Sequence, residues 1–86
     1  GGGALPRAAA RGHVGVLQML LDRLPRDALD AADRGGHTAL HLAALEAEEG
    51  ACVLLAEAGA TLRTQNGAGE WSTDGMPERL VAQLSD

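Results

Sequence analysis

The stretch Gly36-His37-Thr38-Ala39-Leu40-His41-Leu42-Ala43-Ala44 decides how this chain folds. Thr38 is a strong helix N-cap and follows a turn signal over 33–36, so a helix is expected over about 38–46. His41 follows the N-cap by three residues. At that separation one imidazole nitrogen can bond near the threonine while the other reaches the backbone of a neighbouring turn. The leucines and the paired alanines suit close packing against another helix.

This segment belongs to a repeated pattern. The stretch that begins at Leu29 aligns with the stretch that begins at Leu62. The alanine pair at 8–9 and the apolar stretch after it align with the pair at 43–44 at a slightly larger offset. The extra residues fall in a connection over 24–28, where we expect a lengthened loop. A fixed period of roughly 20–50 residues is typical of stacked structural repeats.

Each repeat is predicted to contain a pair of helices. A short helix over 5–11 is followed by one over 14–24, which ends before Pro25. The second helix carries an apolar stripe at three- and four-residue steps, made of Val14, Leu17, Leu20, Leu21 and Leu24. In the next repeat the helix over 38–46 is followed by one over 49–58, which stops at Gly59, a residue free to adopt positive φ.

The pattern breaks after residue 70, where the chain reads Trp71-Ser72-Thr73-Asp74. A closing helix is expected over 77–84, capped by Asp74 or Gly75 and with Pro77 in its first turn. We interpret it as a C-terminal cap, because the end of a repeat stack must present a polar face to water. The lone tryptophan can anchor a partner or seal the end of the core, and sealing is the favoured interpretation.

The middle unit resembles the ankyrin repeat. The residues that carry this resemblance are Asp33, Gly36, Thr38, Ala39, Leu40, His41, Ala43 and Ala44, with the helix ending Leu54-Leu55-Ala56-Glu57-Ala58-Gly59-Ala60. Among them Ala39 departs from the proline usual in the family. The resemblance covers about residues 5–70. It implies an all-α ankyrin-repeat solenoid of about two full repeats plus a degenerate C-terminal capping helix over 71–86, and leaves residues 1–4 as a linker or cloning remnant.

A narrower resemblance is to the C-terminal ankyrin repeats of the zeta and iota diacylglycerol kinases. It is carried by Leu20-Leu21-Asp22, Pro25, Leu29-Asp30-Ala31, Gly36, Thr38, Leu40-His41, Ala43-Ala44, Cys52 and Glu57-Ala58-Gly59-Ala60. In those enzymes the repeats lie outside the catalytic domain and serve protein association.

Composition argues against several classes of function. The chain contains seven Lys and Arg residues and twelve Asp and Glu residues, which gives a net charge of −5. Because the sequence has no basic stripe, we expect no nucleic-acid binding. No apolar run approaches the roughly 18 residues of a membrane span, so we expect no membrane insertion. The single cysteine, Cys52, can form no internal disulfide. We therefore expect an intracellular, cytoplasmic location, with the nucleus as a second compartment.

No set of residues in the sequence predicts catalysis. His37 and His41 are four apart, as helical metal ligands often are, but zinc needs three or four ligands and no HExxH glutamate or nearby cysteine completes the set. Cys52 lies among apolar residues, where a thiol acts as a small buried hydrophobe. The acidic group over 46–49 is best explained as a solvated helix end. We expect no enzyme activity, no cofactor and no metal.

Function is therefore expected at the positions that the repeat leaves variable, on the turns and the exposed side of the first helices. Leu42 and Leu45 are apolar at such positions, as in a protein-binding patch, although they can also pack on a neighbouring turn. The predicted partner-binding residues are Arg7, Arg11, Arg34, His37, Leu42, Leu45, Glu46, Gln65, Glu70 and Trp71. The predicted function is non-catalytic binding of another protein. The alternative is a structural spacer or regulatory segment within a larger signalling enzyme such as a diacylglycerol kinase.

Stability supports one further expectation. An alanine-rich core buries little area per residue, and a stable stack normally needs at least about three repeats. The chain is therefore expected to be a piece of a longer protein, and the alternative is that a partner completes the stack.

Overall fold

The computed structural model describes residues 4–85, except for the side chains of Ala4 and Arg26. Of the predicted linker over 1–4, residues 1–3 lie outside the described residues and Ala4 begins the first helix. The described elements are α1 (Ala4–Arg11), α2 (Val14–Arg23), η1 (Arg26–Asp30), α3 (Ala39–Leu45), α4 (Glu49–Ala58), η2 (Ser72–Gly75) and α5 (Glu78–Leu84), where η marks a 3₁₀ helix.

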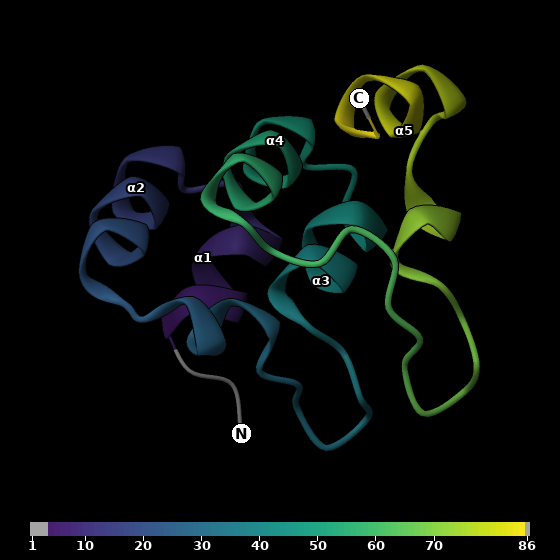
Figure 1. Ribbon diagram of the computed structural model, residues 1–86, viewed down its shortest axis with the longest axis horizontal. Helices are drawn as coiled ribbons and strands as arrows, with labels where there is room; N and C mark the ends of the chain where they lie inside the picture. The colour runs from purple at the N-terminus through teal and green to yellow at the C-terminus, as the bar shows by residue number, and fades with distance from the viewer. Residues whose placement is uncertain (1–3, 86) are drawn as a thin grey trace.

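The elements form two layers. Figure 1 shows α2, α4 and α5 in one layer, α1, α3 and the single turn η2 in the other, and two long loops that extend beyond the second layer. Within each layer an element packs against its counterpart in the next repeat, α1 on α3 and α3 on η2, and α2 on α4 and α4 on α5. The predicted all-α stack of about two full repeats and a degenerate capping unit is confirmed.

The core between the two layers is rich in alanine, as the composition predicts. Small side chains let the helix backbones approach closely, and leucines at the contacts supply most of the buried area. The buried apolar residues are Leu5, Ala8, Ala9, Leu17, Leu29, Ala39, Leu40, Ala43, Ala44, Ala51, Cys52, Leu55, Ala60, Met76 and Leu80. The alanine pairs at 8–9 and 43–44 are both in this core, which explains why they recur between the repeats.

The helix over 14–24 is confirmed, but its apolar stripe faces the core less completely than predicted. Within α2 only Leu17 is fully buried, whereas Val14 is 41% exposed. This helix is the first of the outer layer, so it contacts α4 on one side and lacks an outer neighbour on the other in the described part of the chain. A stripe that would be covered in the middle of a stack is left half open at its end.

The connection over 24–28 is not a plain loop. It leads into η1, whose last turn places Leu29 in the core. The carboxylate of Asp30 then accepts two hydrogen bonds from Thr61, one from the backbone N–H at 2.9 Å and one from the hydroxyl at 2.6 Å. The lengthened connection is therefore tied to the corresponding part of the following repeat.

The closing helix forms where it is expected, but its cap differs from the prediction. The N-cap position of α5 is Pro77, and not Asp74 or Gly75. The reason is that Asp74 is already used one turn earlier, where its Oδ2 accepts the backbone N–H of Trp71 at 2.9 Å. Leu80 is buried, and an ion pair of 2.7 Å between Arg79 and Glu49 joins α5 to α4.

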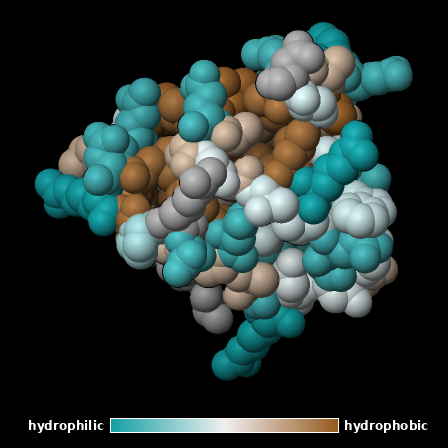
Figure 2. Space-filling model, in the orientation of Figure 1, coloured by the Kyte–Doolittle hydropathy of each residue, from teal (hydrophilic) through white to brown (hydrophobic). Residues whose placement is uncertain are grey.

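Apolar residues are partly exposed on the outer layer. On the face shown in Figure 2 they lie among hydrophilic side chains over the outer helices, while the turns are neutral or hydrophilic. The half-buried apolar residues that pack against the core are Leu20, Leu21, Leu24, Val53, Leu54, Leu62, Val81 and Leu84. Among the described helices none has the length and apolar character required to cross a membrane.

Candidate functional site

The first loop is a tight turn held by one carboxylate. Asp33 Oδ1 accepts the backbone N–H groups of Gly35 and His37, each at 2.9 Å. The N–H of Gly36 donates a hydrogen bond of 3.0 Å to the carbonyl of Asp33, and Gly36 adopts φ +81°. A short polar side chain that bonds its own backbone two residues ahead is the mechanism by which Asp and Asn nucleate turns.

The second loop forms the same turn in the next repeat. Asn66 Oδ1 accepts the N–H groups of Ala68 and Glu70, each at 2.9 Å, as Asp33 does in the first turn. The N–H of Gly69 bonds the carbonyl of Asn66 at 3.0 Å, and this glycine also has φ +81°. The expected turn at Asn66-Gly67 is confirmed, and its backbone copies the first.

The two turns are hydrogen-bonded to each other. The N–H of Gly67 donates to the carbonyl of Gly35 at 2.7 Å. His37 lies between the turns, with Nδ1 at 3.3 Å from the carboxylate of Asp33 and Nε2 at 3.2 Å from Asn66 Nδ2. Because the carboxylate can only accept, Nδ1 carries the proton and Nε2 accepts from the amide. The turns therefore present their tips as one connected surface.

His41 links α3 to the second turn, as the sequence predicts. Its Nδ1 accepts the N–H of Thr38 at 3.2 Å, and its own N–H donates to Thr38 Oγ1 at 3.3 Å, which completes a capping box. Its Nε2 lies 3.3 Å from the carbonyl of Glu70. Both Thr38 and His41 are 5% exposed, so these bonds are shielded from water. The residue is structural, and its bonds set the distance between α3 and the second turn.

A pocket of about 200 Å³ opens beside the two turns. One side is formed by the paired turns, one by the end of α3 and one by η2. The residues that line it are His37, His41, Leu45, Asn66, Glu70, Trp71, Ser72, Asp74 and Gly75. The pocket exists because η2 is a single turn where a full first helix would stand in a regular repeat.

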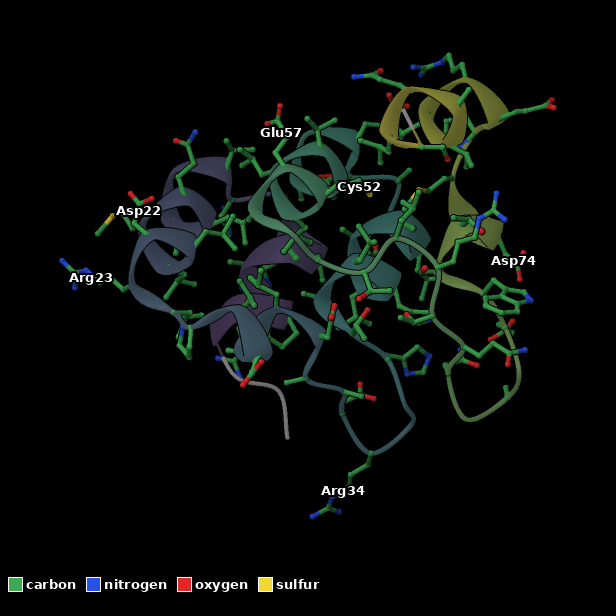
Figure 3. All side chains as sticks on the ribbon, in the orientation of Figure 1. Asp22, Arg23, Arg34, Cys52, Glu57 and Asp74 are labelled. Atoms are coloured by element: carbon green, nitrogen blue, oxygen red, sulfur yellow. The ribbon has the colours of Figure 1, made fainter. Side chains whose placement is uncertain are left out.

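The structure brings some of the predicted partner-binding residues together and separates others. His37, Leu45, Glu70 and Trp71 line the pocket. The others lie elsewhere on the turns or on the inner layer, and they are Arg7, Arg11, Arg34, Leu42, Glu46 and Gln65. Figure 3 shows Arg34 at the tip of the first turn, directed away from the body of the molecule, and Asp74 at the opposite edge. Arg34 is therefore outside the pocket, whose lining includes Glu70 and Asp74.

The prediction that Trp71 seals the core is wrong. Its side chain is 45% exposed and lies on the pocket wall, while Met76 and Leu80 close the end of the core. Trp71 occupies the N-cap position that Thr38 holds in the preceding repeat. Thr38 is buried there, whereas Trp71 opens the degenerate third unit and its side chain lies on the pocket wall.

The two predicted surface leucines differ. Leu45 is 69% exposed at the end of α3, whereas Leu42 is half-buried. Leu45 is therefore an apolar side chain in the lining of the pocket, whereas Leu42 lies outside that lining.

The histidine pair is arranged for structure. The rings of His37 and His41 meet edge to face at a centroid distance of 6.0 Å and an interplanar angle of 89°. Each ring is engaged by the turns, with Nε2 of His37 accepting from Asn66 and Nδ1 of His41 accepting from Thr38. In residues 4–85 no group of three or more His, Cys, Asp or Glu side chains is placed to hold a metal ion.

Cys52 is a buried thiol in α4. Burial, together with the negative charges of Glu49 and Glu48, raises the pKa of its thiol to about 11. A thiol with so high a pKa is almost entirely protonated at neutral pH, and the thiolate is the nucleophilic form. The predicted role as a small buried hydrophobe is confirmed.

Asp74 is a pocket residue that the sequence analysis did not assign to the site. It occupies the place of His41 in the repeat and plays the same part, because its Oδ2 accepts the N–H of Trp71 as His41 Nδ1 accepts that of Thr38. The alignment of the repeats already pairs Asp74 with His41, so this equivalence could have been found in the sequence. Buried Ser72 was also missed, and its hydroxyl donates to the carbonyl of Leu62 while it accepts the N–H of Thr64.

Comparison with known proteins agrees with the geometry. Residues 35–67 match the ankyrin repeat family, a range that begins in the first turn and ends in the second. The chain is 41% identical over 80 residues to diacylglycerol kinase iota of Mus musculus and of Homo sapiens, which covers 92% of this chain and 7% of each relative. It is 36% identical over 66 residues to diacylglycerol kinase zeta of Rattus norvegicus, which covers 77% of this chain and 7% of that protein.

The predicted resemblances to the ankyrin repeat and to the zeta and iota diacylglycerol kinases are thus both confirmed. The chain spans only about 7% of the length of these relatives, so it corresponds to a small part of them. The repeat geometry, the turn pairing and the sequence comparison lead to one assignment. Residues 35–67 form an ankyrin repeat, and the chain as a whole is similar to part of diacylglycerol kinases iota and zeta.

Proposed function

We propose that this chain is a non-catalytic module that binds another protein across its turn tips and the adjacent face of its first helices. The observation that carries the proposal is the fixed pair of turns, joined by the bond from Gly67 to Gly35 and extending beyond the inner layer. A surface that is rigid before binding loses little conformational entropy when a partner docks.

The side chains on this surface support protein binding. Leu45 and Trp71 are exposed apolar groups beside charged ones, the composition expected of an interaction patch. Large aromatic residues are frequent binding anchors. The buried thiol of Cys52, with its raised pKa, is unsuited to nucleophilic catalysis.

A matched pair of substitutions tests this surface. Tagged chain is used to capture partners from cell extract, and the affinity of each purified partner is then measured for wild type, Leu45→Glu and Met19→Glu. Both positions carry exposed apolar side chains of similar size, at 69% and 58%, but Met19 lies on the outer helix α2. We expect Leu45→Glu to weaken binding at least about tenfold, or about 1.4 kcal/mol, and Met19→Glu to leave it unchanged. Equal affinities for all three proteins would contradict the proposal.

A second candidate function rests on the comparisons. Because the chain is similar to part of two diacylglycerol kinases and spans about 7% of them, it is also suited to be a spacer or regulatory segment of a larger signalling enzyme. In that case no partner is captured at micromolar concentrations, and Leu45→Glu has no effect on any complex. Either function fits the proposed intracellular, cytoplasmic location, for which the lone buried thiol of Cys52 is the support.

A further inference from the structure

The pocket beside the turns combines an aromatic wall with carboxylates. Trp71, with 45% of its surface exposed, forms one wall, and Leu45 lies at the rim. Glu70 and Asp74 contribute the charged groups of the lining, which contains no Arg or Lys among the described residues. Its volume of about 200 Å³ equals that of roughly six to seven water molecules, enough for the head and stem of one long side chain.

The two carboxylates are held in place, and each keeps an oxygen available. Glu70 Oε1 accepts from Asn66 Nδ2 at 3.0 Å, and Asp74 Oδ2 accepts the N–H of Trp71 at 2.9 Å. In the described part of the chain, no hydrogen bond is made by Glu70 Oε2 or by Asp74 Oδ1. Arg34, a basic residue of the turn surface, projects from the far tip (Figure 3). The pocket is therefore an anionic, aromatic site fixed before a ligand arrives.

We propose that this pocket takes an arginine side chain from a basic segment of a partner protein. A planar guanidinium can stack on the face of an indole while its edge donates to carboxylate oxygens, and these charge-assisted bonds are the strong ones. The negative charge of the chain, −5 in total, complements such a segment. This inference rests on the proposed protein-binding function and gives the chemistry of one contact within it.

A small-molecule titration tests the contact directly. The probe is N-acetyl-arginine amide, and the matched control is N-acetyl-citrulline amide, which has a similar shape and no charge. Trp71 is the single tryptophan of the chain, so its fluorescence reports on the pocket alone. We expect the arginine amide to bind with a dissociation constant of about 1 mM, as a ligand of this size should, and the citrulline amide at least about tenfold more weakly.

Substitutions within the pocket sharpen the test. Glu70→Gln and Asp74→Asn retain the oxygen that accepts from Asn66 or Trp71, so the fold is kept while one charge is removed. Each is expected to weaken arginine binding roughly three- to tenfold. Glu57→Gln removes the same charge from an exposed position on α4, remote from Asp74 in Figure 3, and should leave binding unchanged.

The aromatic wall is tested with Trp71→Leu. This variant has no tryptophan, so binding is followed by calorimetry, and the affinity should fall at least about fivefold. Far-UV circular dichroism checks that each variant is folded.

Several results would overturn the inference. These are equal binding of arginine and citrulline amides, an equal loss for Glu57→Gln and Glu70→Gln, or unchanged binding by Trp71→Leu. If the probe fails to bind while Leu45→Glu still weakens capture of a partner protein, the arginine contact is wrong and the proposed function stands. If the probe binds as expected and Leu45→Glu has no effect on any complex, the pocket is right and the wider binding surface is wrong.

Discussion

In the turn over 33–37 a carboxylate oxygen accepts two backbone N–H groups, and in the turn over 66–70 an amide oxygen does the same at the same distances. The chain that follows each turn is different. After the first turn Thr38 opens the seven-residue helix α3, whereas after the second Trp71 opens η2, a single 3₁₀ turn. The turn therefore folds from its own few residues, and the helix after it depends on a cap and on alanines that pack.

The largest expected difference between the turns comes from their glycines. Gly36 and Gly69 share φ +81°, but an added Cβ at Gly36 would lie 2.6 Å from the backbone nitrogen of Gly67, while at Gly69 it would meet nothing within 4 Å. Gly36→Ala combines backbone strain with a clash between the turns, so we expect a loss of at least about 3 kcal/mol. Gly69→Ala involves strain alone and should cost about 1 kcal/mol. Urea unfolding followed by circular dichroism measures both, and equal losses would show that the turns do not pack as described.

The next largest effect is expected at the helix cap. Thr38→Ala removes the hydroxyl that accepts the N–H of His41, and should destabilise the chain by about 1–2 kcal/mol. The control is Thr73→Ala in η2, because the hydroxyl of Thr73 makes no hydrogen bond in the described part of the chain. We expect that change to stay within about 0.5 kcal/mol. An equal loss of unfolding free energy for Thr38→Ala and Thr73→Ala would contradict the capping role of Thr38.

The smallest expected effect concerns acid. The pKa of Asp33 is lowered below its usual 3.8, chiefly because its carboxylate accepts the N–H of His37, while Asn66 in the second turn does not titrate. A carboxylate with a lowered pKa contributes stability above its unfolded pKa and loses it as the pH falls through the folded value. Asp33→Asn keeps the turn and removes this contribution. The difference in urea midpoint between about pH 6 and about pH 3 should therefore be smaller for Asp33→Asn than for wild type. An unchanged difference would argue that the carboxylate is not held in the turn.

Local signals account for what the sequence could predict. The Thr38 and His41 capping box, the stop at Gly59 and the turn at Asn66 each depend on residues within a few positions, and each is confirmed. The exposure of Trp71 depends on how the third unit folds after its alanine pair is lost. The pocket depends on two turns that are distant in the sequence, so no local pattern contained it.

The repeat alignment contains a signal that no short motif shows. Asp74 occupies the place of His41 and bonds the same backbone position, although a carboxylate and an imidazole look unrelated in a motif. The open face of Val14 illustrates the opposite limit, because whether an apolar stripe is covered depends on the neighbour beyond it. A helix pattern shows which side is apolar and cannot say what lies against it.

The bond from the Gly67 N–H to the Gly35 carbonyl has a consequence for how such a chain can change in evolution. It joins two successive turns near their tips. An insertion or deletion within either tip would shift one turn relative to the other and break this hydrogen bond. The extra residues of the first repeat lie instead in the connection over 24–28, before the bonds between Asp30 and Thr61. A backbone contact therefore fixes the spacing between the turns, while the side chains around it can change without altering that spacing.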